Sequence, residues 1–289
     1  PALMFYRLLS HLPFPLLYGL AWLGYFMIFH VVRYRRDVVA GNLSKAFPEK
    51  SEAQRKSLAR AFYRQFTQVV LEIIKARRMQ PEDFLQRARI LNPELLQQYS
   101  QNFSESVIVL TIHQGNWEWM LHAAATQLNI PITPVYKTLH NKAADKLIYD
   151  IRSQFGSRPI SMDESVKDII RKRREFRIFV MVADQSPIRR ERGYWTRFMN
   201  QEANFYLGAE TIATMTKFPV LFVQCHRRSK GHYEIEFKEL AKPPYNKDTH
   251  AVTDRYVEMA EEAIREEPES WLWTNRRWKR DRAKEESTD

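Results

Sequence analysis

Short apolar runs alternate with segments of helical periodicity along most of the chain, and this alternation limits the folds open to it. Apolar runs with the length and composition of buried strands cover residues 107–112, 132–136, 178–183, 220–224 and 233–237. Helical spacing predicts helices over residues 51–79, 117–128, 143–155, 166–174, 208–216 and 249–266, and a short one after Pro81. Such alternation predicts an α/β sandwich in which helices flank a central sheet. Sites in these folds lie beyond the carboxyl ends of strands.

The N-terminal segment contains an uncharged apolar run. Residues 12–32 include no Asp, Glu, Lys or Arg, and about 20 apolar residues suffice to cross a bilayer core. Pro13 falls at the start, where a helix tolerates proline. A cleaved signal peptide is excluded because the run is too long and no small-x-small cleavage site follows it. A spanning or deeply inserted helix is favoured, and a helix lying in the interface or against the domain is the alternative.

Charges around the run predict an orientation. Arg33, Arg35 and Arg36 follow it, whereas only Arg7 precedes it. The positive-inside rule therefore places the rest of the chain on the cytoplasmic side, with these cations at the level of anionic headgroups. We expect a membrane anchor over residues 1–36, one globular domain over residues 37–282 and a polar tail over residues 283–289.

Composition narrows the class of partner. The chain has 45 Lys and Arg against 34 Asp and Glu, a net charge of +11, which favours nucleic acid, anionic lipid or an acidic protein. The single cysteine, Cys225, excludes an internal disulfide and any multi-cysteine metal site. Its apolar flanks predict a buried, inert thiol in a strand.

Two segments interleave cations with aromatic residues. Arg189 and Arg190 lie shortly before Tyr194, and residues 271–280 alternate tryptophans with basic residues. Such segments suit a phosphorylated lipid headgroup or a membrane interface, and they equally suit single-stranded nucleic acid. Alternatively, Trp271 and Trp273 belong to the core beside a solvated basic face. The apolar N-terminal run decides against nucleic acid.

The segment His113-Gln114-Gly115-Asn116-Trp117-Glu118 carries the candidate chemistry. The strand over residues 107–112 places His113 at a strand end. Asn116 can cap a helix that begins at Trp117, which puts Glu118 in the first turn and brings imidazole and carboxylate together.

A neutral histidine can take a proton from a hydroxyl or amine, and a carboxylate on its other nitrogen fixes the tautomer. This is the base-and-orienter part of a catalytic triad, with the acceptor substrate as nucleophile. Gly115 would let a substrate approach the backbone, and N–H groups at the helix start would help hold an oxyanion. Chance spacing is one alternative. A metal site built from His113, Glu118 and His122 is another, although no His-Glu-x-x-His pattern is present.

Several blocks resemble the bacterial lipid A biosynthesis late acyltransferases, which are lauroyl or myristoyl acyltransferases within the lysophospholipid acyltransferase family with its His-x4-Asp/Glu motif. The similarity runs from about residue 1 to residue 280. The matching blocks are Arg36 with Asn42-Leu43 and Phe47-Pro48, residues 113–118, Arg152 with Phe155-Gly156, Ala183-Asp184-Gln185, Phe198, Tyr206-Leu207-Gly208 and Pro219.

The resemblance implies a glycerol-phosphate-acyltransferase-like αβ sandwich, with a central mixed sheet and an N-terminal membrane helix. It implies acyl transfer from acyl carrier protein or acyl-CoA to a hydroxyl of a lipid A precursor, at the cytoplasmic face of the inner membrane, without metal or cofactor. His113 would be the general base and Glu118 its partner. Arg152 would bind a phosphate or stabilise the oxyanion, unless it is a surface charge. Asp184 would orient substrate or cap a turn.

One departure from the family's pattern concerns the acceptor. The family often continues its third block with acidic or aromatic residues and a glycine, whereas this chain continues Gln185-Ser186-Pro187 and then a basic stretch that includes Arg189 and Arg190. We expect this loop, together with Gly115 and Asn116 of the first block, to contact substrate. A lysophospholipid or aminolipid acceptor is an alternative, and a non-catalytic membrane lipid-binding protein is another.

Overall fold

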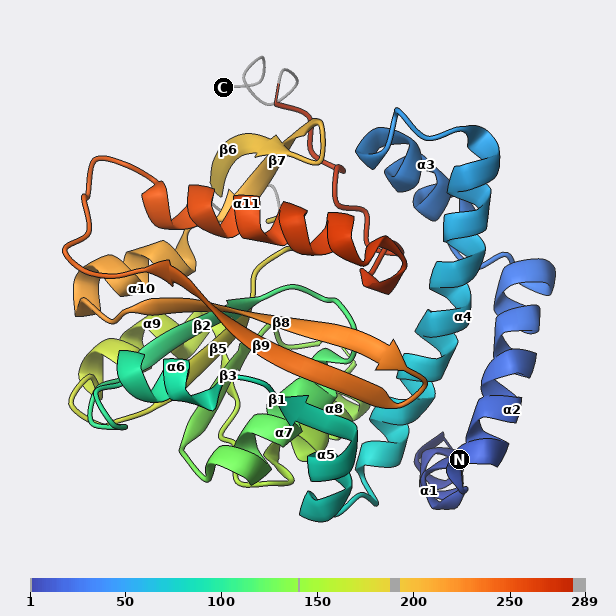
Figure 1. Ribbon diagram of the computed structural model, residues 1–289, viewed down its shortest axis with the longest axis horizontal. Coiled ribbons are helices and arrows are strands. Elements are labelled where there is room, and N and C mark those ends of the chain that lie inside the picture. Colours follow the sequence, from blue (N-terminus) through green and yellow to red (C-terminus); the bar gives the residue numbers. More distant parts are fainter. Residues whose placement is uncertain (1, 140, 188–192, 283–289) are drawn as a thin grey trace. The chain divides into compact units, whose positions relative to one another are not determined.

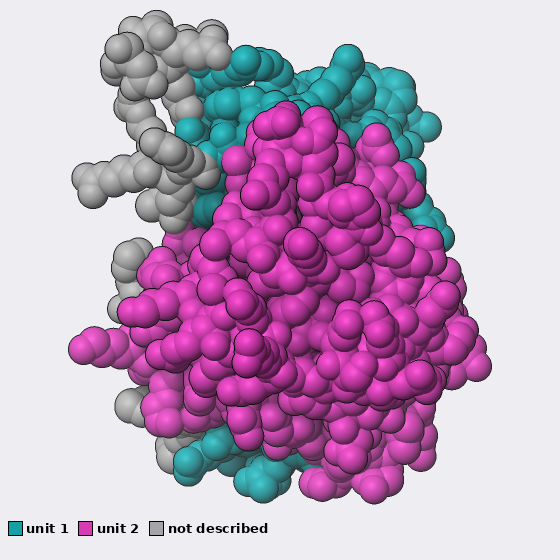
Figure 2. Space-filling view, turned by 90° about the vertical axis from the view of Figure 1, so that its left-hand side faces the viewer, with its two compact units in different colours: residues 1–78, 185–206, 261–289 teal, residues 79–184, 207–260 magenta. Residues whose placement is uncertain are grey.

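The computed structural model describes residues 2–139, 141–187 and 193–282, with side chains from residue 6 onward. These residues form two compact units, shown in two colours in Figure 2. One unit comprises residues 1–78, 185–206 and 261–289, and the other comprises residues 79–184 and 207–260. The expected polar tail, residues 283–289, lies outside the described residues, and the predicted boundary after residue 36 stays a prediction.

The second unit contains a mixed seven-stranded sheet (Figure 1). Its strands, in spatial order, are β1 (Ala88–Ile90), β9 (His232–Ala241), β8 (Val220–Ser229), β2 (Val107–Thr111), β5 (Ile178–Val182), β3 (Ile132–Tyr136) and β4 (Ile160–Ser161). All neighbours are parallel except β8 and β9. Every residue of β2 is buried, because a central parallel strand is covered on both faces.

Helices cover both faces of this sheet, which confirms the predicted α/β architecture. They are α5 (Pro81–Arg87), α6 (Pro93–Tyr99), α7 (Trp117–Leu128), α8 (Lys142–Ser153), α9 (Met162–Arg171), α10 (Gly208–Thr216) and α11 (Ala251–Glu266). On one face lies α11 (Figure 1), whose Tyr256 packs on Phe222 and donates a hydrogen bond to the Thr111 carbonyl. On the other, the Trp119 ring of α7 meets Tyr233, with centroids 5.8 Å apart.

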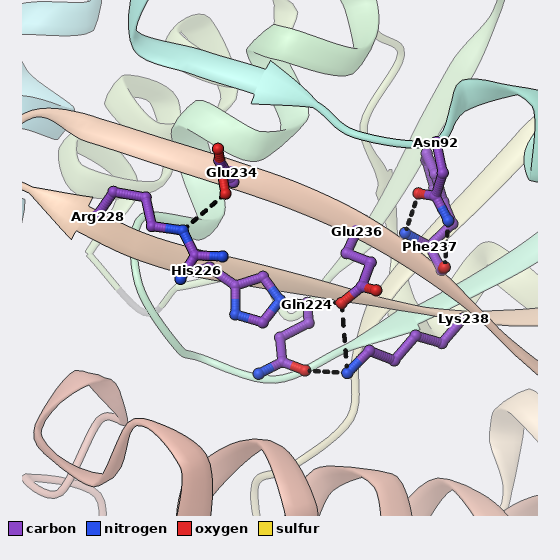
Figure 3. A network of polar contacts seen from close by, with 8 residues as sticks. All are labelled: Asn92, Gln224, His226, Arg228, Glu234, Glu236, Phe237 and Lys238. Carbon is purple, nitrogen blue, oxygen red and sulfur yellow. Dashed lines mark hydrogen bonds and ion pairs between the residues drawn. The ribbon is translucent and has the colours of Figure 1, made fainter.

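The β8–β9 hairpin carries a polar network that the sequence patterns did not indicate (Figure 3). Gln224 accepts a hydrogen bond from Lys238 at 2.7 Å, and His226 lies 3.1 Å from Glu236. Arg228 donates to Glu234 at 2.7 Å. These residues alternate along the two strands and therefore share one face. Cross-strand pairs of this kind help fix the register of the hairpin.

The first unit contains the N-terminal helices. They are α1 (Ala2–His11), α2 (Phe14–Phe26), the π-helical turn η1 (Met27–Val31), α3 (Arg36–Ala46) and α4 (Glu52–Ala76). It also holds the hairpin of β6 (Gly193–Phe198) and β7 (Gln201–Tyr206), the 3-10 turn η2 (Pro268–Ser270) and the last residues of α11. The helix predicted from residue 51 begins with a capping box of Ser51 and Gln54. Among the described residues, one helical stretch, Phe14–Val31, is long and apolar enough to cross a membrane.

The C-terminal tryptophans belong to the core of the first unit. Trp271 and Trp273 are 2% and 0% exposed, and their ring centroids lie 4.7 Å apart. Arg277 is also buried, donates to the Asn204 carbonyl and lies over the Phe205 ring at 4.1 Å. The core interpretation of these tryptophans is therefore confirmed, and Arg277 serves packing rather than a surface patch.

Candidate functional site

Two neighbouring strands bring His113 and Asp184 to the same edge of the sheet. β2 and β5 are parallel, with Thr111 opposite Val182, and each of the two polar residues lies two positions beyond its strand's paired end. The Ala183 N–H continues the ladder by donating to the Thr111 carbonyl at 3.2 Å. Because carboxyl ends of parallel strands meet at one edge, the side chains are adjacent although 71 positions separate them.

The Asp184 carboxylate contacts both the ring and the backbone of His113. Its Oδ1 lies 2.6 Å from Nδ1 of the imidazole, and its Oδ2 accepts a hydrogen bond from the His113 N–H at 3.0 Å. Asp184 is 2% exposed and the His113 side chain 17%. A carboxylate on Nδ1 favours the tautomer with the proton on that nitrogen, so Nε2 carries the lone pair. The site thus contains an imidazole whose orientation is fixed by this carboxylate.

Glu118 occupies the predicted first turn of α7 but binds a different partner. Asn116 caps the helix, as expected, by accepting from the Trp119 N–H at 3.0 Å. The Glu118 carboxylate takes two bonds from Arg152 of α8, at 2.5 Å from Nη2 and 3.0 Å from Nε. The contact with imidazole Nδ1 that the sequence suggested for Glu118 belongs to Asp184, because the sheet order places β5 beside β2. Arg152 is no surface charge.

Burial and charge act in opposite directions on this pair. Burial alone would raise the pKa of the Glu118 carboxyl, but the Arg152 guanidinium outweighs it and, helped by the nearby His122 and His113, holds that pKa below its usual value. Burial likewise lowers the pKa of Arg152, and Glu118 more than restores it. Both groups are therefore ionised at neutral pH, and Glu118 lies near enough to His113 to respond to its charge.

Gly115 is required by a close approach within the fold. Its φ is +59°, and a Cβ there would lie 2.5 Å from the Cys225 carbonyl oxygen of β8. Any side chain would displace that strand. The structure thus gives Gly115 a role in packing against β8, and its predicted contact with a substrate stays a prediction. Cys225 itself is buried, as predicted.

His122 lies one turn after Glu118 in an aromatic enclosure. Its ring contacts Phe84 and Phe155, with centroids 5.3 and 5.2 Å away. Within the described part of the chain, neither of its ring nitrogens has a hydrogen-bond partner. Burial lowers its pKa to about 4, so it is neutral at physiological pH. The alternative of a metal site would need Glu118 as a ligand beside His122, but the Glu118 carboxylate is bound by Arg152. Among the described residues, no group of three or more His, Cys, Asp or Glu side chains could hold a metal ion.

Replacing His122 by leucine should remove an acid-sensitive step in stability. Between about pH 6.5 and 4 the unfolded state binds a proton that the folded state does not, so the wild type should lose up to about 3 kcal/mol of unfolding free energy as pH falls. Urea denaturation at several pH values measures this loss. The leucine variant should lose less over that window and be at least as stable at pH 7.5, because two unpartnered nitrogens are removed. If the unfolding free energy of the leucine variant fell with pH as steeply as that of the wild type, His122 would not be the group responsible for the loss.

An apolar pocket lies between α7 and the sheet. Met120 and Leu121 of α7 line it together with Val109 of β2, Val223 of β8 and further aliphatic side chains. Among the described residues that line it, none is charged. The pocket thus shares α7 with the motif that carries Glu118.

Three further residues, Gln185, Arg189 and Arg190, were predicted from the sequence to contact substrate. Gln185 follows Asp184 directly and is half-buried. Arg189 and Arg190 lie outside the described residues, so their predicted contact with substrate stays a prediction. Both His113 and Asp184 could be placed at strand ends from the sequence, but their contact required the strand order.

An oriented imidazole lies at the carboxyl end of a central strand, beside a buried carboxylate–guanidinium pair, and acid–base enzymes use groups of these kinds. Residues 2–280 match the family model of the bacterial lipid A biosynthesis acyltransferases, and the chain belongs to this family. The resemblance found in the sequence blocks is thereby confirmed. No match to the chain was found among curated proteins.

Proposed function

We propose that the protein transfers a fatty acyl chain to a hydroxyl of a lipid A precursor. The donor is an acyl thioester, carried either by acyl carrier protein or by coenzyme A. Family membership supports acyl transfer of the lipid A type. The observation that carries the chemistry is the 2.6 Å contact between His113 Nδ1 and Asp184. It leaves Nε2 as the nitrogen able to take a proton from the acceptor hydroxyl.

In this scheme the acceptor oxygen attacks the thioester carbonyl carbon while Nε2 of His113 takes the hydroxyl proton. The Asp184 carboxylate stabilises the resulting imidazolium through Nδ1. When the tetrahedral intermediate collapses, the C–S bond breaks and the imidazolium returns the proton to the leaving thiolate. The products are the ester and the free thiol. This acid–base scheme uses side chains alone.

Glu118 acts in two ways under this proposal. Its negative charge, which the lowered pKa maintains at neutral pH, lies near the His113 imidazole and stabilises the positive charge that develops there during proton transfer. It also holds Arg152 in place. The Arg152 side chain is 18% exposed, and its guanidinium presents donors suited to a phosphate or an oxyanion. The pair therefore keeps a positive group at the site without leaving a buried charge uncompensated.

The membrane supports the placement of the substrate. The family and the apolar N-terminal helix suggest membrane association, and we propose the cytoplasmic face of the inner membrane. Gln185, Arg189 and Arg190 remain our candidates for contacts with the acceptor headgroup.

Purified protein supplied with an acyl thioester and a panel of acceptors tests the proposal. We expect a new ester, detected by mass spectrometry, on a lipid A precursor, and lipid A from cells lacking the protein should lack one acyl chain. If the acyl chain were transferred to a lysophospholipid or an aminolipid instead, the proposed acceptor would be wrong and the proposed acyl-transfer chemistry would stand. Binding of lipid A precursor without any ester formation, by protein whose fold is verified, would favour a lipid-binding protein and overturn the proposal.

A further inference from the structure

Helix α4 lies against α2 along the length of α2, and the contacts run antiparallel (Figure 1). The successive neighbours along α2 and its continuation η1 are Phe14 with Lys75, Tyr18 with Glu72, Gly24 with Thr67, Tyr25 with Arg64 and Phe29 with Tyr63. The apolar N-terminal helix is therefore one half of a packed helix pair. Its Leu17 and Ala21 are 0% and 1% exposed.

Charged side chains of α4 are held beside α2 at several levels. Lys75 donates hydrogen bonds to the carbonyl oxygens of Ser10 and Leu12, at 3.0 and 2.9 Å. Glu72 accepts a bond from the Tyr18 hydroxyl at 2.9 Å. Arg64 lies 5.7 Å from the Tyr25 ring centre, and it is exposed. From Phe14 to Tyr25 these levels extend over about 16 Å, at 1.5 Å per residue.

A transmembrane position of α2 would conflict with this packing. The hydrocarbon core is about 30 Å thick, so a spanning α2 would carry Arg64 and Glu72 into it together with α4. Charged side chains inside the core are costly unless they face other protein or water. To avoid that cost, α2 would have to separate from α4 and lose the whole set of contacts.

The side of α2 away from α4 exposes large apolar side chains. Leu16, Leu20, Leu23 and Met27 follow one another at helical spacing and are 59%, 39%, 51% and 41% exposed. These four side chains form the lipid-facing stripe, and Trp22, 66% exposed, lies on a flank of the helix outside it. By sequence α2 is apolar all round, so amphipathicity belongs to the helix pair: apolar on the free side of α2, charged on α4.

Exposed cations lie beyond both ends of α2. Arg7 precedes it and Arg33 follows it, and both are exposed. In a helix that lies flat, both guanidinium groups reach the headgroups of the same leaflet, whereas a spanning helix would place them on opposite sides. Their charge suits anionic phospholipid.

We propose that α2 lies in the plane of the bilayer surface, with the lipid-facing stripe inserted into one leaflet, Arg7 and Arg33 at anionic headgroups, and α4 on the water side. The partner is the surface of an anionic phospholipid bilayer. This inference rests on the membrane association that is part of the proposed function. It changes the way in which the protein binds the membrane, from a transmembrane anchor to a helix pair that enters one leaflet only.

The side of the membrane on which residues before and after α2 lie tests this mode, with one position just before α2 and one in the turn between α3 and α4. Full-length His11→Cys and Glu49→Cys variants are labelled with a membrane-impermeant maleimide in sealed vesicles of both orientations. Both cysteines should react from the same side, and the parent chain, with only the buried Cys225, gives the background. Reaction from opposite sides would establish a spanning helix and overturn the proposal, and so would recovery of the protein in the soluble fraction.

Vesicle binding tests the stripe itself. The double variant Leu16→Glu and Leu23→Glu should bind vesicles of phosphatidylglycerol and phosphatidylcholine at least tenfold more weakly than the parent, with a circular dichroism spectrum that verifies the fold. Leu85→Glu, at a side chain 56% exposed on α5, is the matched control and should bind like the parent. Equal loss in both variants would overturn the role of the stripe. Acyl transfer measured in detergent reports on the proposed function separately, so either conclusion can fail alone.

Discussion

Replacing His113 by alanine is expected to lower kcat/KM for acyl transfer by about 10³-fold, because general bases contribute roughly 10² to 10⁴. The variant should fold normally, since the His113 side chain is partly exposed. His232→Ala, at an exposed histidine on the β8–β9 hairpin, is the control and should retain full activity. Steady-state kinetics of the purified proteins measures both. Transfer by His113→Ala within threefold of the parent would show that another group is the base.

Asp184→Asn distinguishes the two carboxylates near His113. The amide keeps the shape of Asp184 but loses the charge that stabilises the imidazolium and its preference for a proton on Nδ1, so kcat should fall by at least about 10²-fold with a small change in KM. If Asp184→Asn were nearly as active as the parent while Glu118→Gln was inactive, Glu118 rather than Asp184 would be the partner of the base.

The largest effect on stability is expected at the Glu118–Arg152 pair. Breaking a buried ion pair by removing one partner leaves a buried charge uncompensated, which costs about 3–5 kcal/mol. Glu118→Gln and Arg152→Met should each lower the unfolding free energy by about this amount in urea denaturation. Asp150→Asn breaks the exposed Lys146–Asp150 pair on α8 and should cost less than about 1 kcal/mol.

A double variant separates the structural role of the pair from its role in catalysis. Glu118→Leu combined with Arg152→Met leaves no unpaired charge and should recover most of the stability lost by either single removal. Transfer should nevertheless stay low, because the guanidinium and the charge near His113 are absent. Recovery of activity along with stability would contradict any part for the pair in the chemistry.

The pH dependence of this pair has a definite sign. The pKa of the Glu118 carboxyl is depressed in the fold, so its stabilising contribution is present above the unfolded value of about 4.5 and is lost as pH falls further. His122 acts earlier in an acid titration, from about pH 6.5 downward. The His122→Leu variant should therefore retain only the more acidic of the two transitions.

Local patterns were sufficient where the determining contacts are close in sequence. The cap at Asn116 and the helix from Trp117 follow from hydrogen bonds within one turn, and the predicted strand at residues 132–136 agrees with β3. The β6–β7 hairpin was missed, because its strands carry polar and aromatic residues without a clear apolar alternation.

The His113 motif, the alternation of strands and helices and the uncharged run at residues 12–32 can all be read from the sequence, because each depends on neighbours along the chain. The partners of these features depend on strand order and helix packing, which involve residues far apart in sequence. Only the pairing of β2 with β5 assigned Asp184 to the imidazole and left Glu118 to Arg152. In the same way, only the packing of α4 on α2 revealed charged side chains beside a helix that is apolar by sequence, since hydropathy records composition and not neighbours.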